Sequence, residues 1–191
     1  MYERAARLRG AMKKVSRYWD WVPRADPQIF YEYWDGTAPT HHLYGLRAAL
    51  DMIAEEGLQN VWRRHEILAG TYWAACETWK AGDQGIVMNV ADPSNRSRAV
   101  TALRMPSPQA TALREWCEGQ AGVTLGIGLG MAPPGDPAWH GFFRVGHMGH
   151  VNAHMVLGVI GTIEAGLTAL QIPMGGSGAA AASAHVAQSL S

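Results

Sequence analysis

The order of helical and β-type segments between residues 85 and 170 constrains the fold of this chain more than any other feature. Runs rich in β-forming residues lie at 85–90, 99–105, 123–129 and 142–148. Apolar residues at helical spacing fit helices at 108–120 and 153–170. Because hairpin-length and helix-length connections are mixed in this order, it favours a small α+β domain. We predict one antiparallel or mixed sheet with helices covering one face.

The first third of the chain has a different pattern, dominated by helices and an aromatic arm. Helices are predicted at 3–15, 41–57 and 61–80. Gly57 is predicted to cap the C-terminus of a helix. The proline-containing segment 18–27 separates the first two helices. After that segment the chain is expected to run extended to Thr40. We therefore divide the chain into 1–80, with the arm and the long helices, and a sheet domain at 81–191.

Charge and cysteine content exclude several classes of partner. Sixteen basic residues balance sixteen acidic ones, so no net field draws the chain to nucleic acid or to an anionic membrane. No apolar run approaches the roughly 18 residues that span a bilayer, and no signal-peptide pattern follows the basic N-terminus. The two cysteines form no CxxC motif, which predicts neither a disulfide framework nor a zinc site. We expect a cytoplasmic protein with small, neutral partners.

Tryptophan is unusually frequent, and it gathers near the N-terminus. Of eight tryptophans, five lie in or near the first third: Trp19, Trp21, Trp34, Trp62 and Trp73. So much aromatic surface in one region indicates packing against something larger than the chain itself. A private aromatic core is the alternative, and composition alone leaves both open.

The segment DGTAPTHHLYGLR at 35–47 joins a flexible glycine and the hydroxyl of Thr37 to the start of a helix. A hydroxyl and free backbone amides in such a loop are what an anion such as phosphate requires. The alternative is an ordinary helix start with Thr40 as its N-cap. Both interpretations remain open at this point.

The segment FRVGHMGHVNAH at 143–154 is the densest candidate site in the sequence. Arg144 lies between apolar residues on a predicted strand, and a guanidinium in that setting needs an anion, such as a carboxylate. A salt bridge with an internal acid is the alternative. The spacing of His147, His150 and His154 would suit a metal on one continuous helix, but Gly149 and the strand pattern argue against such a helix. We predict no metal site.

Two glycine-rich segments invite comparison with phosphate-binding loops. GIGLG at 126–130 and GGSG at 175–178 match neither GxGxxG between a strand and a helix nor GK[ST]. We interpret the first as a strand end that permits close backbone approach, and the second as a linker.

Three segments together resemble the class V, fold-type I aminotransferases of the alanine-glyoxylate and serine-glyoxylate kind. They are YEYWDGTAPTHHLYGLRAALDMIAEEGLQNVWRRHEILA, VTLGIGLGM and FRVGHMGHVN, in the family's order. The resemblance covers nearly the whole chain and implies the C-terminal part of such an enzyme. It further implies that residues 1–80 end the large domain and that 81–191 form the small domain, as well as a pyridoxal-phosphate cofactor, amino acid and 2-oxo acid substrates, and a homodimer.

The resemblance assigns roles to particular residues. Arg144 matches the family arginine that binds the substrate α-carboxylate. Thr37 matches the position whose hydroxyl reaches the cofactor phosphate across a dimer. A tyrosine just before that threonine shares the task in the family, and here it corresponds to Tyr33 or, in strict register, to Trp34.

The main departure from the family concerns the lysine that forms its Schiff base with the cofactor. Only Lys13, Lys14 and Lys80 are present, and none stands in the family's strand-end motif; the first two are expected on a solvated helix face. We therefore expect a transaminase that is a C-terminal fragment or split half, dependent on a lysine-bearing N-terminal half and inactive alone. The alternative is a non-catalytic remnant or dimerisation module.

Overall fold

The computed structural model describes residues 2–25, 28–82 and 85–190. Two compact units are present, Met1–Gly57 and Leu58–Ser191, and each is described by itself. The division predicted at residue 80 refers to the domains of the family and stays a prediction.

The first unit consists of helices and short helical turns. In chain order these are α1 (Tyr2–Ala11), η1 (Arg17–Trp19), α2 (Val22–Ala25), η2 (Phe30–Tyr33) and α3 (Thr40–Glu56). The helix predicted to continue to residue 15 ends at Ala11, four residues before the predicted end. The prediction of an extended chain up to Thr40 was wrong, because Glu32 N–H bonds Ile29 O and Trp34 N–H bonds Tyr31 O, which close a 3-10 turn.

Helix α3 has nearly the predicted bounds but an unexpected environment. It ends at Gly57, whose φ of 82° is available to glycine at low cost and whose N–H bonds Ile53 O. Local capping thus confirms the predicted C-terminus. None of its residues is buried, although its apolar residues recur at helical spacing.

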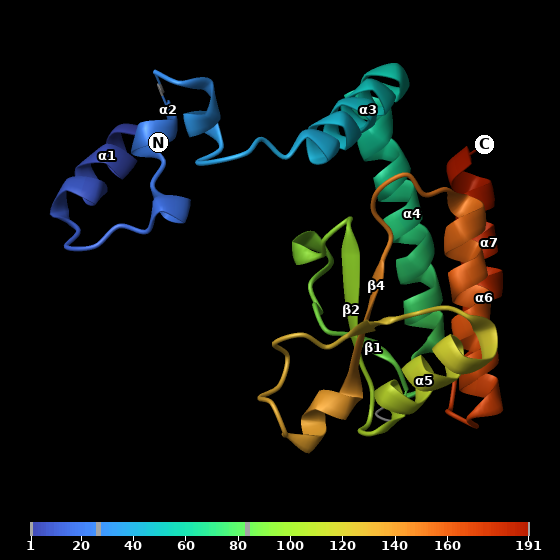
Figure 1. Cartoon of the computed structure of the whole chain (residues 1–191). Coiled ribbons are helices and arrows are strands. Elements are labelled where there is room, and N and C mark those ends of the chain that lie inside the picture. The colour runs from blue at the N-terminus through green and yellow to red at the C-terminus, as the bar shows by residue number, and fades with distance from the viewer. Residues whose placement is uncertain (1, 26–27, 83–84, 191) are drawn as a thin grey trace. The chain divides into compact units, whose positions relative to one another are not determined.

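The second unit has the predicted alternation. Its main elements are α4 (Leu58–Trp79), β1 (Val87–Met88), β2 (Val100–Arg104), α5 (Gln109–Ala121), β3 (Gly126–Ile127), β4 (Phe142–Gly146), α6 (Ala153–Ala169) and α7 (Gly178–Leu190). The strands form one antiparallel sheet in the order β1-β2-β4-β3. Helices α4, α6 and α7 stand together on one side of it (Figure 1). The prediction of an α+β fold with one sheet covered on one face is confirmed.

The core lies between that sheet face and the helices. Along β2 and β4, buried and half-buried residues alternate, so Leu103, Phe143 and Val145 point toward the helices. The buried helix residues Tyr72 and Trp79 join them in one cluster. Because alternate residues face opposite sides of a strand, the residues between them lie on the other face.

Strand β3 is shorter than the predicted 123–129. At its start, Gly122 caps α5 in the left-handed region with φ 67°, and Val123 N–H bonds Cys117 O. At its end, Met131 N–H bonds Gly128 O and turns the chain. Both ends are therefore fixed by backbone bonds that do not belong to the sheet.

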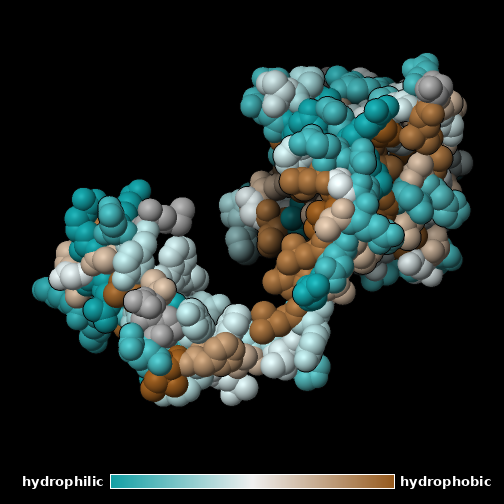
Figure 2. Space-filling model, turned by 90° about the horizontal axis from the view of Figure 1, so that it is seen from above, coloured by the Kyte–Doolittle hydropathy of each residue, from teal (hydrophilic) through white to brown (hydrophobic). Residues whose placement is uncertain are grey.

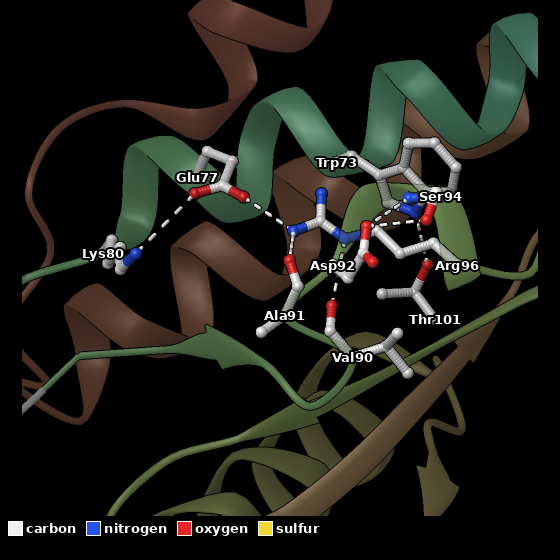
Figure 3. A network of polar contacts seen from close by, with 9 residues as sticks. All are labelled: Trp73, Glu77, Lys80, Val90, Ala91, Asp92, Ser94, Arg96 and Thr101. Carbon is white, nitrogen blue, oxygen red and sulfur yellow. Dashed lines mark hydrogen bonds and ion pairs between the residues drawn. The ribbon is translucent and has the colours of Figure 1, made fainter.

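The loop between β1 and β2 is fastened to α4 by Arg96 (Figure 3). The guanidinium donates to Val90 O, Ala91 O and the Glu77 carboxylate, at 3.1, 3.0 and 3.1 Å. It also lies 5.8 Å from the ring centre of Trp73. These contacts hold the start of β2 beside the helix.

The GGSG segment connects α6 to α7, but it packs more closely than a plain linker. A Cβ at Gly175 would collide with Lys80 O, and one at Gly178 would collide with the Trp79 indole. The backbone must come this close because α7 begins directly against the end of α4. The glycines are therefore required by packing.

Glu164 on α6 links the end of α4 to the start of α7. Its carboxylate accepts bonds from Trp79 Nε1 at 3.0 Å, Ser177 Oγ at 2.7 Å and Ala179 N at 2.9 Å. Burial acts to raise the pKa of Glu164, but these hydrogen bonds outweigh it and lower the pKa below its usual value. The carboxylate also lies at the N-terminus of α7, where negative charge is favoured.

Within the described ranges, none of the helices has the length and apolar character needed to cross a membrane.

Candidate functional site

Arg144 projects from the sheet face opposite the helices. Its neighbours along β4, Phe143 and Val145, are buried in the core, and the alternation of the strand places Arg144 on the other side, where it is half-buried. It pairs with Ala102 on β2 and Gly126 on β3. The strand therefore presents this guanidinium away from the core rather than within it.

One end of the Arg144 side chain is anchored and the other is available. Nε donates to Ile127 O at 2.7 Å. Among the described residues no acidic side chain pairs with Arg144. The internal salt bridge considered from the sequence is therefore not observed, and the two Nη atoms keep the paired geometry that suits a carboxylate.

Small residues leave room for this side chain. A Cβ at Gly126 would lie 3.3 Å from Arg144 Cβ and 3.6 Å from its Nε. A Cβ at Gly128 would collide with Phe142. The interpretation of GIGLG as a strand end that permits close approach is confirmed.

The predicted phosphate residues Tyr33 and Thr37 belong to the first unit. Asp35 between them has a positive φ of 55° and receives Arg17 at 2.7 Å and Arg24 at 3.5 Å. These ion pairs hold the turn that carries Thr37. Both predicted residues are exposed, and Tyr33 makes an edge contact with the Phe30 ring.

The start of α3 differs from an ordinary capped helix. Its N-cap is Pro39, and no side chain caps it. The alternative interpretation, with Thr40 as the cap, does not hold, because Thr40 is the first helical residue and its N–H bonds Ala38 O. The Thr37 hydroxyl has no hydrogen-bond partner within the described ranges, so this turn offers a free hydroxyl beside a helix start.

The three histidines considered as metal ligands are separated by the fold. His147 follows β4 and is buried, His150 lies in the exposed loop, and His154 is on α6. No cluster of three metal-binding side chains occurs among the residues described. His147 instead hydrogen-bonds Thr101, a partner that sequence spacing gave no means of finding.

The lysines are all at the surface. Lys13 and Lys14 are exposed and follow the end of α1 rather than lying on a helix face. Lys80 is 57% exposed and lies 4.0 Å from Glu77. None of the three lies in a buried pocket of the kind that holds a lysine for covalent chemistry.

Comparison with known proteins shows which enzymes this chain is similar to. No family model matches the chain. Serine–glyoxylate aminotransferase of Arabidopsis thaliana is 34% identical over 181 residues, which are 91% of this chain and 41% of that protein. Serine–glyoxylate aminotransferase of Methylorubrum extorquens is 31% identical over 172 residues, 88% of this chain and 40% of that protein.

A solved structure shows the same fold and a related sequence. Pyridoxamine-pyruvate aminotransferase from Mesorhizobium loti superposes with a TM-score of 0.68 and 26% identity, over 80% of this chain and 37% of that one. Over most of its length the chain is therefore similar to class V aminotransferases. It spans about two fifths of the class V aminotransferases that it matches, consistent with a C-terminal part. The resemblance stated from the sequence is confirmed.

Proposed function

We propose that this chain is the C-terminal part of a pyridoxal-phosphate transaminase that transfers an amino group from alanine or serine to glyoxylate or pyruvate. The observation that carries the proposal is Arg144, a half-buried guanidinium with an anchored Nε and no internal acid among the described residues. The relatives named above act on serine and glyoxylate by their names.

Arg144 would hold both substrates by the group they share. An amino acid donor and a 2-oxo acid acceptor each carry a carboxylate beside the reacting carbon. A planar guanidinium binds that carboxylate through two parallel hydrogen bonds, which fix its orientation as well as its position. One arginine would therefore orient each substrate in turn.

The fit of the cofactor rests on the turn before α3. The free Thr37 hydroxyl and the uncapped helix start suit a phosphate, and we propose that Thr37 and Tyr33 contact it. Pyridoxal phosphate would carry the amino group between the two substrates. The exposed lysines do not suit its covalent attachment, so we propose that another segment or a partner polypeptide supplies that lysine.

The proposed partner is a second copy of the chain or a lysine-bearing N-terminal half. The exposed aromatic residues of the first unit support this, since they need a covering surface. We place the assembly in the cytoplasm, where reduced thiols such as those of Cys76 and Cys117 persist.

A second candidate is a non-catalytic remnant or dimerisation module. The exposed lysines favour it, because the fold and the interface could persist without chemistry. It predicts association with partner protein and no transamination under any pairing.

Complementation tests the proposal and separates the two candidates. The chain would be co-expressed with the part of the Arabidopsis thaliana enzyme that it does not match, and serine–glyoxylate turnover measured. In an active complex, Arg144→Lys should raise the barrier by on the order of 2 to 3 kcal/mol for both substrates, because an ammonium loses the paired bonds.

Arg104→Lys provides the matched control. Arg104 lies on the same sheet face and has no acidic partner in the described part of the chain, so turnover should be unchanged. Equal kinetics for Arg144→Lys and Arg104→Lys would remove Arg144 from the site. A complex that forms but never turns over would support the remnant.

A further inference from the structure

The chain after β4 is held down by several side chains from other elements. We call residues 146–151 the strand-end segment. Pairing of β4 with β2 ends at Gly146, opposite Val100, and His147 N–H extends it with a 2.9 Å bond to Ala99 O. From there the chain leaves the sheet, and hydrogen bonds from side chains take the place of the backbone hydrogen bonds between strands.

The His147 side chain links the strand-end segment to β2 and α4. Nδ1 lies 3.1 Å from Arg98 O, and Nε2 lies 2.9 Å from Thr101 Oγ1. Because a carbonyl can only accept, Nδ1 carries the proton and Nε2 accepts from the Thr101 hydroxyl. That hydroxyl in turn accepts from Trp73 Nε1 at 3.0 Å, as Figure 3 shows. With the ring neutral, the Thr101 hydroxyl donates to His147 Nε2 and accepts from Trp73, so each donor in this chain of bonds has an acceptor.

His65 on α4 has the same arrangement. Its Nδ1 lies 2.7 Å from Val61 O and must donate, which leaves Nε2 to accept the Gly149 N–H at 3.1 Å. The neighbouring Arg64 donates to Gly149 O and Val151 O, both at 2.9 Å. Two neutral histidines and one arginine thus fasten the strand-end segment to α4 and to the start of β2.

The same strand carries Arg144, two residues before Gly146. The register that pairs Gly146 with Val100 also pairs Arg144 with Ala102. A slip by one residue would turn Arg144 to the opposite face and break its bond to Ile127 O. Because β4 has only five residues, contacts at its end contribute a large share of what fixes that register.

We propose that His65 and His147, each neutral with its proton on Nδ1, are positioning residues for Arg144 that act by holding the strand-end segment. The link to carboxylate binding rests on the function proposed above. The effect on the position of Arg144 does not depend on that function.

Acid should weaken the hydrogen bonds that hold the strand-end segment. Burial lowers the pKa of His147, the bond to Arg98 O opposes that, and nearby His65 lowers it further. A protonated His65 presents a donor at Nε2, where the Gly149 N–H requires an acceptor. A protonated His147 presents a donor toward the Thr101 hydroxyl, which must then turn from donating to accepting. The Tyr72 ring centre lies 6.0 Å from that of His147, and Arg98, whose carbonyl bonds His147, has its guanidinium paired with Glu66.

Nuclear magnetic resonance of the full chain tests the proposal without any cofactor. Two signals are followed as the pH falls from 7.5 to 5, a window that extends below the ordinary histidine pKa near 6.5 because that of His147 is lowered. One is the exchange protection of the Gly149 amide, and the other is the hydrogen-bonded Nε–H of Arg144. We expect the Gly149 protection factor to fall at least about tenfold, the 1.4 kcal/mol equivalent of one lost bond, with loss of the Arg144 signal in parallel.

Glutamine variants separate the titration from the structural role. The amide oxygen of His65→Gln or His147→Gln reaches the place of Nε2 and accepts at any pH. Each variant should therefore remove part of the pH dependence, and the double variant should remove it. His150→Gln, on the exposed part of the same segment, should leave it unchanged.

Two outcomes would overturn the proposal. The first is a Gly149 amide that loses protection while the Arg144 Nε–H signal persists, and the second is a double variant that keeps the native pH dependence. Addition of pyruvate at pH 7.5 tests the proposed function separately. If pyruvate leaves the Arg144 signal unmoved while the pH results hold, carboxylate binding fails and the positioning stands.

Discussion

The two units of the chain enclose very different amounts of their apolar surface. In the first, Asp20 is the one buried residue among those described, and Trp19 is 73% exposed. In the second, a continuous cluster that includes Trp79 and Phe143 is closed to solvent. Figure 2 shows hydrophobic groups at the surface beside hydrophilic ones.

This difference bears on the tryptophans. Trp19, Trp21, Trp34 and Trp62 are each at least 37% exposed, so they form no private core. Only Trp73 of that group is half-buried. The second unit has the core that an independent fold needs, whereas the apolar residues of the first unit stay unburied.

Replacing one tryptophan from each unit gives the largest expected contrast. Trp79→Ala should lower the free energy of unfolding of the second unit by about 3 to 5 kcal/mol, because it leaves a cavity in the core. Trp19→Ala should change that quantity by less than about 0.5 kcal/mol. Urea unfolding followed by circular dichroism measures both. An equal loss of unfolding free energy in both variants would contradict the difference in burial between the two units.

Two helical glycines sharpen the comparison at smaller scale. A Cβ at Gly166 on α6 would lie 2.8 Å from Leu113 Cδ1 and 2.9 Å from Trp116 Cε3, whereas one at Gly45 on α3 meets nothing within 4 Å. Gly166→Ala should therefore destabilise the second unit by about 1 to 3 kcal/mol. Gly45→Ala should stabilise α3 by about 0.5 to 1 kcal/mol. Hydrogen exchange of each helix reports the sign, and the same sign for both would contradict the structure.

A third comparison concerns Glu164, and its expected effect depends on pH. Glu164→Gln should cost on the order of 1 to 2 kcal/mol at pH 7, because charge-assisted bonds are weakened. Since the folded-state pKa of Glu164 is lowered, its contribution is full above the unfolded pKa and is lost as pH falls through the folded pKa. The variant and the native chain should therefore converge in acid. Glu115→Gln, exposed on α5, should show no such convergence.

The candidate site was predictable in part. Arg144 could be singled out because a strand pattern and a lone cation coincide in sequence, and its role in carboxylate binding stays a prediction together with Thr37 and Tyr33. The hydrogen bonds that His147 and His65 make to distant residues could not be predicted this way. Thr101 lies 46 residues from His147, and Gly149 lies 84 residues from His65, so no local spacing connects them.

The sequence by itself determined the order and type of the main helices and strands of the second unit, and the end of α3 at Gly57. Helical periodicity and glycine capping act over one or two turns, and any chain with those residues experiences them. The tertiary structure decided which strands pair, that Arg144 lies opposite Ala102 and away from the core, and that the apolar residues of α3 remain exposed. Those outcomes depend on contacts between distant segments, where burial against a particular neighbour outweighs local preference.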